Sequence, residues 1–206
     1  TWEKALDGRL QDAERLRILS VLAGIDAESG NWEKVSTFLA QQLAGQDAAG
    51  LLFWKERMRP VGKTLVPSLI AILDNSANEQ QVRSFALEAL LDYASDDRET
   101  IFSLMARAPV RLLPRVMDIA LRQTDFHIPR ALTEIGGKTK DPTDPEELEK
   151  GVMRKANLAI FLLNTNRRDM VWPLLKTGEN PSLRTEILHA LPKTNFDPRV
   201  LAERLA

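Results

Sequence analysis

The stretch LVPSLIAILDNSANEQQVRSFALEALLDYA, residues 65–94, is the part of the chain that decides the fold. Its second half carries apolar residues at helical spacing, so that they share one helix face: Val82, Phe85, Ala86, Ala89, Leu90 and Tyr93. The polar run 74–78 separates this helix from an apolar helix before it. Asn78 and Gln81 form a capping-box pattern, which predicts the start of the second helix. The stretch therefore predicts two helices joined by a short turn.

The rest of the chain is predicted to be helical as well, because apolar residues recur at helical spacing in each segment. Asx, acidic and proline residues mark most of the expected starts, namely Asn31, Asp47, Asp97, Pro109, Asp144-Pro145, Asn180-Pro181 and Asp197-Pro198. The expected helices cover residues 9–27, 32–43, 48–58, 98–107, 109–123, 126–135, 144–164, 168–176, 182–191 and the residues after 197. No run alternates apolar and polar residues as a strand does. The sequence therefore predicts an all-α fold.

Composition excludes several classes of function. Lys and Arg number 28 and Asp and Glu 29, so the net charge is -1 and no basic field attracts nucleic acid. The absence of cysteine excludes disulfides, thiolate catalysis and Cys-ligated zinc. No apolar run approaches the length of a membrane span. We expect no nucleic-acid partner and no membrane insertion by this segment.

The chain starts at Thr1 without an initiator methionine or an apolar leader. We expect a fragment of a larger protein. Its compartment is open: cytoplasmic by default, and extracytoplasmic if the parent carries a membrane span upstream.

The helix pair resembles a HEAT repeat. Pro67 lies early in the first helix, Asp74 closes it, and Val82-Arg83 opens the second. Residues 171–175, followed by Leu183-Arg184, repeat part of this pattern. We expect an α-α superhelix of degenerate HEAT/ARM-like helix pairs. It would form one domain over 1–206, with an irregularity at 136–143.

Several strings together resemble the helical-repeat region of large bacterial multidomain proteins: residues 31–35, 54–67, 154–159, 171–175 and 181–184. In that family a Ser/Thr protein kinase domain, or a domain like the formylglycine-generating (sulfatase-modifying) enzyme, is joined to a long repeat segment. The resemblance implies that the repeat segment is not the catalytic part and that it often follows a membrane span.

Catalytic and cofactor motifs are incomplete. Residues 61–64 and 136–139 end like phosphate-binding loops but lack the earlier glycine and the leading strand. His127 and His189 have no acidic neighbours at metal-ligand spacing. We expect no catalytic residue, no metal and no cofactor.

The candidate partner-binding residues are Trp54, Arg57, Arg59, Arg83, Arg184 and His189. Trp and Arg dominate binding hot spots, although Trp54 can instead belong to the core with the charges as its solvated face. Arg83 is also expected to form a structural ladder with Asp74, the commoner role of such an arginine in a HEAT-like unit. Arg184 lacks an equivalent Asp, so we expect it either to pair with Glu179 or to be free for a partner.

The sequence therefore favours a non-catalytic scaffold that docks a protein, a peptide or a flanking domain of its own chain. Self-association is possible, since no polar cap helices mark the ends of the array. Two alternatives stay open: a pure oligomerisation module, and a HEAT-like DNA glycosylase type of enzyme, which the neutral charge opposes.

Overall fold

The computed structural model of the chain describes residues 1–137, 144–165, 167–175, 181–194 and 196–200. Of these residues 79% are helical and none lies in a strand, which confirms the all-α class. The chain divides into two compact units, Thr1–Asp96 and Asp97–Ala206. The expectation of one domain over 1–206 stays a prediction, and residues 138–143 of its expected irregularity lie outside the described part.

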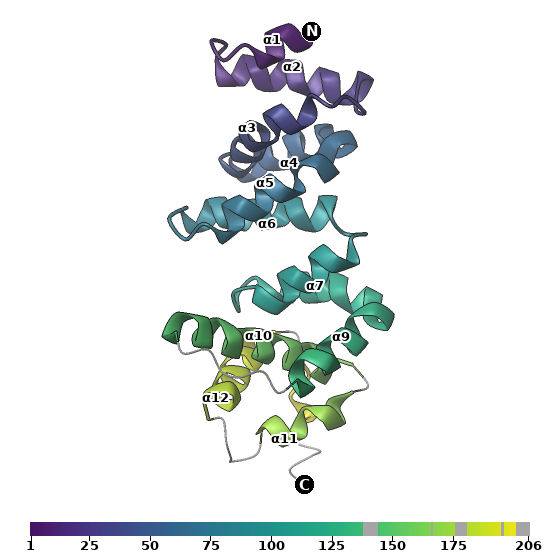
Figure 1. Cartoon of the computed structure of the whole chain (residues 1–206), viewed down its shortest axis with the longest axis vertical. Helices are drawn as coiled ribbons and strands as arrows, with labels where there is room; N and C mark the ends of the chain where they lie inside the picture. The colour runs from purple at the N-terminus through teal and green to yellow at the C-terminus, as the bar shows by residue number, and fades with distance from the viewer. Residues whose placement is uncertain (138–143, 166, 176–180, 195, 201–206) are drawn as a thin grey trace. The chain divides into compact units, whose positions relative to one another are not determined.

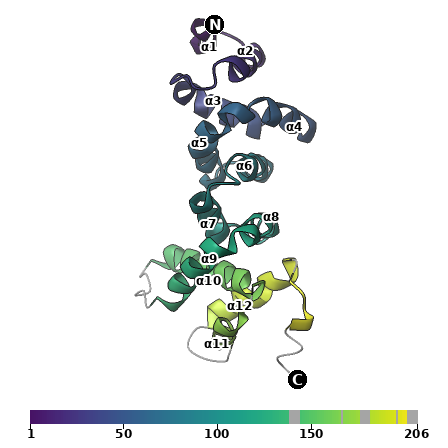
Figure 2. The ribbon, with the colours of Figure 1, turned by 90° about the vertical axis from the view of Figure 1, so that its right-hand side faces the viewer.

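The first unit is built from six α-helices and one 3-10 turn (Figure 1). The elements are α1 (Trp2–Leu6), α2 (Asp12–Ile25), α3 (Trp32–Ala44), α4 (Ala48–Arg57), η1 (Arg59–Val61), α5 (Gly62–Asp74) and α6 (Gln80–Tyr93). Helices α3 and α5 pack side by side in one layer, and α4 and α6 form a second layer (Figure 2). Leucines on the facing surfaces, such as Leu39, Leu69 and Leu90, are fully buried and make the core between the layers.

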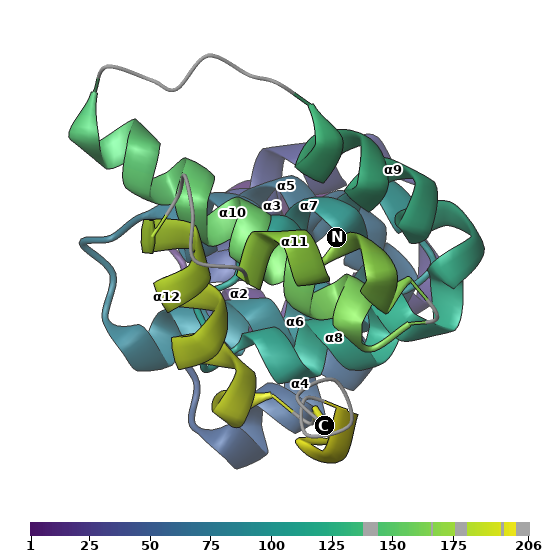
Figure 3. The ribbon, with the colours of Figure 1, turned by 90° about the horizontal axis from the view of Figure 1, so that it is seen from below.

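In the second unit, several helices pack around one long helix, α10 (Pro145–Leu163). Its described elements are α7 (Arg98–Arg107), α8 (Leu113–Ala120), η2 (Leu121–Gln123), α9 (Thr124–Gly136), α10 (Pro145–Leu163), η3 (Arg168–Met170), α11 (Trp172–Leu175), α12 (Pro181–Ala190) and η4 (Leu191–Lys193). Helices α7, α9 and α12 pack against α10 (Figure 3). The second half of α10, from Ala156 to Leu163, is buried throughout.

Three of the expected helix starts are confirmed by hydrogen bonds. Asp47 accepts from Gly50 N at 2.7 Å, Asp97 from Glu99 N at 3.1 Å, and Asp144 from Glu146 N at 3.3 Å. These carboxylates satisfy backbone N–H groups that have no partner inside the helix. Asn31 precedes α3 but forms no such bond, and Asn180 lies outside the described residues.

Two segments of the structure differ from the expectation. The helix expected from Pro109 begins only at Leu113, because Pro109 opens a turn in which its carbonyl accepts from Leu112 N at 2.8 Å. The short helix α1 was not expected. Its Trp2 ring packs edge-on against Trp32, with ring centroids 4.7 Å apart, and its indole N–H donates to Asp26 at 2.6 Å.

Gly62, the first residue of α5, lies directly against the Tyr93 ring of α6. A Cβ atom at this position would lie 2.5 Å from Cδ1 of Tyr93. The Tyr93 ring is buried, and its hydroxyl donates to the carbonyl of Lys55 at 2.8 Å. Burial and this hydrogen bond therefore hold the ring in place, so that it cannot easily move away from an added Cβ atom.

We expect Gly62→Ala to lower the free energy of unfolding by about 2 kcal/mol, the usual effect of overpacking a core. Gly24→Ala is the matched control. Gly24 lies within α2 with no atom within 4 Å of an added Cβ, so alanine there should stabilise by up to about 1 kcal/mol through helix propensity. Urea denaturation of both variants tests the contrast. Equal shifts of the two midpoints would contradict it.

Candidate functional site

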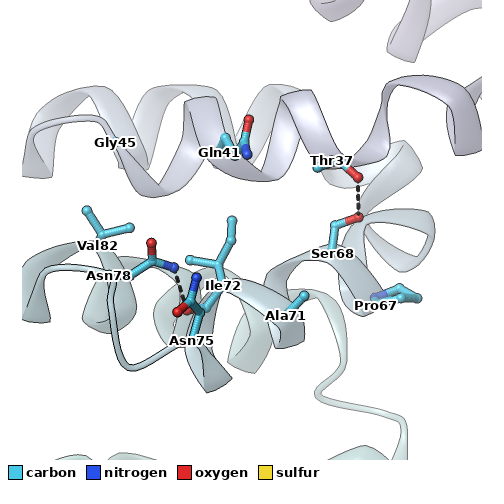
Figure 4. Close-up of a pocket in the computed structure, with 10 residues that line it drawn as sticks. All are labelled: Thr37, Gln41, Gly45, Pro67, Ser68, Ala71, Ile72, Asn75, Asn78 and Val82. Atoms are coloured by element: carbon cyan, nitrogen blue, oxygen red, sulfur yellow. Dashed lines mark hydrogen bonds between the residues drawn. The ribbon is translucent and has the colours of Figure 1, made fainter.

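A groove of about 520 Å³ lies between α3, α5 and the start of α6 (Figure 4). The described residues that line it are Thr37, Gln41, Gly45, Pro67, Ser68, Ala71, Ile72, Asn75, Asn78 and Val82. None of these carries a charge. Apolar atoms come mainly from α5, while hydroxyl and amide groups come from α3, α5 and the turn before α6. The groove is therefore uncharged and mainly apolar, with hydroxyl and amide groups among its lining residues.

Some of its polar groups already have intramolecular partners. The Ser68 hydroxyl lies 3.5 Å from that of Thr37 and donates to Ser36 Oγ at 3.1 Å. Asn78 Nδ2 donates to the carbonyl of Ile72 at 3.0 Å, and Asn75 Oδ1 accepts from Ala77 N at 3.0 Å. These bonds fix the two asparagines at the rim of the groove.

Other polar groups stay available to a ligand. The exposed amide of Gln41 makes no hydrogen bond within the described residues. The second polar atom of each asparagine, Nδ2 of Asn75 and Oδ1 of Asn78, is likewise without a protein partner in the described part. Together they present both donors and acceptors. Such a surface matches a neutral ligand that carries both apolar groups and hydrogen-bonding groups.

Asn78 does not have the capping role expected from the sequence. The residue before α6 is Glu79, which makes no side-chain capping bond, and the Asn78 amide instead bonds to a carbonyl near the end of α5. The last carbonyls of a helix lack intrahelical donors, so this bond closes α5. The capping-box expectation at Asn78 was therefore wrong.

The candidate residues around Trp54 do not line this groove. Trp54 is half-buried and packs edge-on against the exposed ring of Phe53, with centroids 5.0 Å apart. The guanidinium of Arg57 lies 4.8 Å from the centre of the Phe53 ring. These side chains share the surface of α4, and whether they bind a partner stays a prediction.

Arg59 belongs to an ion-pair network between η1 and the helices beside it. Its guanidinium lies 2.8 Å from Glu56 and 3.0 Å from Asp92, while Lys55 lies 3.3 Å from the same Asp92. The hydrogen bond from Arg59 lowers the pKa of the Glu56 carboxyl. The network gives Arg59 an intramolecular role that sequence reasoning did not foresee.

Arg83 secures the end of α5. Its Nε donates to the carbonyl of Leu73 at 2.8 Å, next to the Asp74 that was its expected partner. Arg15 makes the same bond in the first helix pair, donating Nε to Ala5 at 2.8 Å. Both arginines are the fourth residue of their helix and follow the acceptor by ten residues. The Asp74–Arg83 ladder itself stays a prediction.

Arg184 and His189 lie on α12, in the second unit. Arg184 is half-buried, and the exposed His189 has Nε2 at 3.1 Å from Lys193 Nζ. Glu179, the acid expected near Arg184, lies outside the described residues. These two candidates therefore belong to the second unit, whereas the other four belong to the first. None of the six lines the groove.

The groove was missed because its residues are unremarkable in type. Thr37, Gln41 and Ala71 carry no motif, and only the folding of α3 beside α5 brings them together. Pro67 and Asn78 were noticed, but as helix signals. No sequence signal marked the groove itself.

No group of three or more His or acidic residues is placed to hold a metal ion in the described ranges. In the same part of the chain, no helix combines the length and the apolar character needed to cross a bilayer.

Comparison of the chain with protein-family models, with curated proteins and with solved structures gives no significant match. These comparisons assign no family to the chain.

Proposed function

We propose that this chain is a non-catalytic docking segment of a larger protein and that the groove between α3 and α5 binds an extended peptide. The peptide comes from a partner protein or from a flanking domain of the same parent. The observation that carries the proposal is the uncharged groove of about 520 Å³, whose rim offers free amide groups.

The chemistry of the groove supports a peptide ligand. An extended peptide presents N–H donors and C=O acceptors along its backbone, and an amide side chain can satisfy both kinds. Gln41, Asn75 and Asn78 supply such groups, while Pro67 and Ile72 offer apolar surface to the peptide side chains. Because no lining residue in the described part is charged, we expect a neutral peptide segment to be preferred over an acidic or basic one.

Recurring local features support an architecture of degenerate HEAT-like pairs. The Arg15 and Arg83 bonds repeat one contact in two helix pairs. Helices α5 and α9 each have 13 residues, each follow a three-residue 3-10 turn, and each carry proline at the sixth position, Pro67 and Pro129. Repeated units of this kind form superhelices that bind extended segments. A parent of the bacterial multidomain type, with a kinase or sulfatase-modifying domain, fits this proposal.

The test is selection from a phage-displayed library of random peptides on the immobilised chain, followed by fluorescence anisotropy with the recovered peptides. Ala71→Glu places a charged side chain in the groove from an exposed position of α5. We expect it to weaken binding at least about tenfold, the effect of losing roughly 1.4 kcal/mol. Ala13→Glu, at an exposed alanine of α2 that does not line the groove, should leave the affinity unchanged.

Two results would overturn the proposal. One is a selection that yields no peptide above background. The other is a set of peptides that bind Ala71→Glu as tightly as the unchanged chain. Peptides that contain mainly charged residues would contradict the preference for a neutral segment.

A further inference from the structure

Helix α3 forms one edge of the groove. Thr37 and Gln41 line this edge one helical turn apart, and Gly45, just after the helix, continues it (Figure 4). Residues four apart lie on the same face of a helix, and the axis rises about 6 Å between them. Because Gly45 has no side chain, the polar side chains of this edge are those of Thr37 and Gln41.

The hydroxyl of Thr37 has a defined direction, because it is the first of three linked hydroxyl groups. Each hydroxyl has one hydrogen to donate and lone pairs with which to accept. Ser36 donates its hydrogen to the carbonyl of Glu33 at 2.9 Å, so Ser36 accepts from Ser68 at 3.1 Å. Ser68 then has no hydrogen left for Thr37, and the contact of 3.5 Å between them runs from Thr37 to Ser68. The exposed Thr37 oxygen therefore presents an acceptor to the groove.

Gln41 presents both a donor and an acceptor. Its exposed amide makes no hydrogen bond within the described residues, so Nε2 and Oε1 are both available to a ligand. An amide of this kind can donate to a backbone carbonyl and accept from a backbone N–H at the same time. The α3 edge therefore offers an acceptor at Thr37 and a donor–acceptor pair at Gln41.

The repeat of an extended peptide matches the spacing of these two side chains. An extended chain rises about 3.3 Å per residue, and its N–H and C=O groups point to the same side at every second residue. Two residues of peptide therefore span about 7 Å, close to the rise of about 6 Å between Thr37 and Gln41. The long side chain of Gln41 can adjust to the difference.

We propose that α3 recognises alternate residues of the bound peptide. Thr37 accepts the backbone N–H of one peptide residue, and the Gln41 amide bonds to the N–H and C=O of the residue two positions away. This inference rests on the proposed function, since it concerns the same groove, and it adds a rule of specificity. Proline has no N–H, so it is excluded from the peptide position at Thr37.

Methylation of single backbone nitrogens in the selected peptides tests this rule, with binding measured by fluorescence anisotropy. Thr37→Val keeps the branched shape of the side chain and removes its oxygen. We expect it to weaken binding about fivefold, the effect of losing one neutral hydrogen bond. At one peptide position, methylation should weaken binding to the unchanged chain about fivefold more than binding to Thr37→Val, because the variant has already lost that bond. Gln41→Ala should show the same coupling two positions away.

Thr133→Val is the matched control, because Thr133 is an exposed threonine of α9 that does not line the groove. It should leave the affinity and the methylation pattern unchanged. The inference is overturned if no methylated position is coupled to Thr37, or if the positions coupled to Thr37 and Gln41 are not two apart. In both cases, peptides that Ala71→Glu still blocks would leave the groove as the peptide site. A selection without peptides, or peptides indifferent to Ala71→Glu, would overturn both proposals.

Discussion

Replacing Asn157 with alanine is expected to lower the free energy of unfolding by about 3 kcal/mol, because two buried carbonyls would lose their donor. Asn157 is 1% exposed in the middle of α10. Its Nδ2 donates to the carbonyls of Met105 at 3.1 Å and Ala108 at 2.9 Å, with a longer contact of 3.4 Å to Ala106. The Asn157 side chain therefore supplies the hydrogen-bond donor for the carbonyls at the end of α7.

The end of α7 depends on this donor for a local reason. The last carbonyls of a helix have no hydrogen-bond partner within the helix. They commonly accept hydrogen bonds from the backbone N–H groups of the residues just after it. The chain continues from Ala108 in an extended conformation into Pro109, which has no N–H. The donor must therefore come from elsewhere in the fold, and Asn157 supplies it.

Urea denaturation followed by circular dichroism measures the effect. Asn164→Ala is the matched control, because Asn164 is half-buried and its side chain makes one hydrogen bond within the described residues, to the carbonyl of Ile160 in the last turn of α10, at 2.9 Å. It should lose only about 1 kcal/mol. Asn157→Asp should be at least as harmful as alanine, because a carboxylate would face carbonyl oxygens. A loss at Asn157→Ala no larger than at Asn164→Ala would refute this account.

The all-α class was predictable because its signals are local. A carboxylate such as Asp47 or Asp144 caps the helix that follows it, and this bond needs no distant partner. Helix α1 could not be predicted in this way. It has only five residues, too few for an isolated helix, and is held by contacts from residues outside the helix. Those contacts are the packing of Trp2 on Trp32 and the Arg15 bond to Ala5.

The same distinction applies to the candidate site. Arg59 and Arg83 stand out by residue type, yet their described partners are intramolecular, a carboxylate pair and a backbone carbonyl. The groove, by contrast, arises from the packing of α3 on α5, and packing partners are not written in the local sequence. Residue type therefore indicated which side chains can bind a partner. It did not indicate where the packed helices form a groove.

Buried His127 is expected to make the chain acid-sensitive. Its ring is fully buried, stacks on Phe102 with centroids 5.8 Å apart, and lies edge-on to Phe126 and Phe161. Nε2 lies 3.2 Å from Gln123 Oε1, whereas Nδ1 has no partner in the described part. A charge on this ring would be poorly solvated.

Burial, with a smaller contribution from the nearby Arg98, lowers the pKa of His127 from 6.5 to about 4. Arg130 acts in the same direction, while Asp125 and Glu99 oppose it. Between these two pH values the unfolded chain binds a proton that the folded chain does not. The stability contributed by neutral His127 is therefore complete above pH 6.5 and is lost as the pH falls toward 4. The loss amounts to about 3 kcal/mol, since one pKa unit corresponds to about 1.36 kcal/mol.

The measurement is the free energy of unfolding by urea at a series of pH values from neutral to acidic, for the unchanged chain and for His127→Phe. Phenylalanine keeps an aromatic ring among the other rings and removes the titrating group. The carboxylates that also titrate in acid are common to both proteins, so they cancel in the difference. We expect the difference between the two curves to grow by about 3 kcal/mol from pH 6.5 to 4 and to stay constant above that range. Parallel curves over the whole range would show that His127 is not the acid-sensitive group.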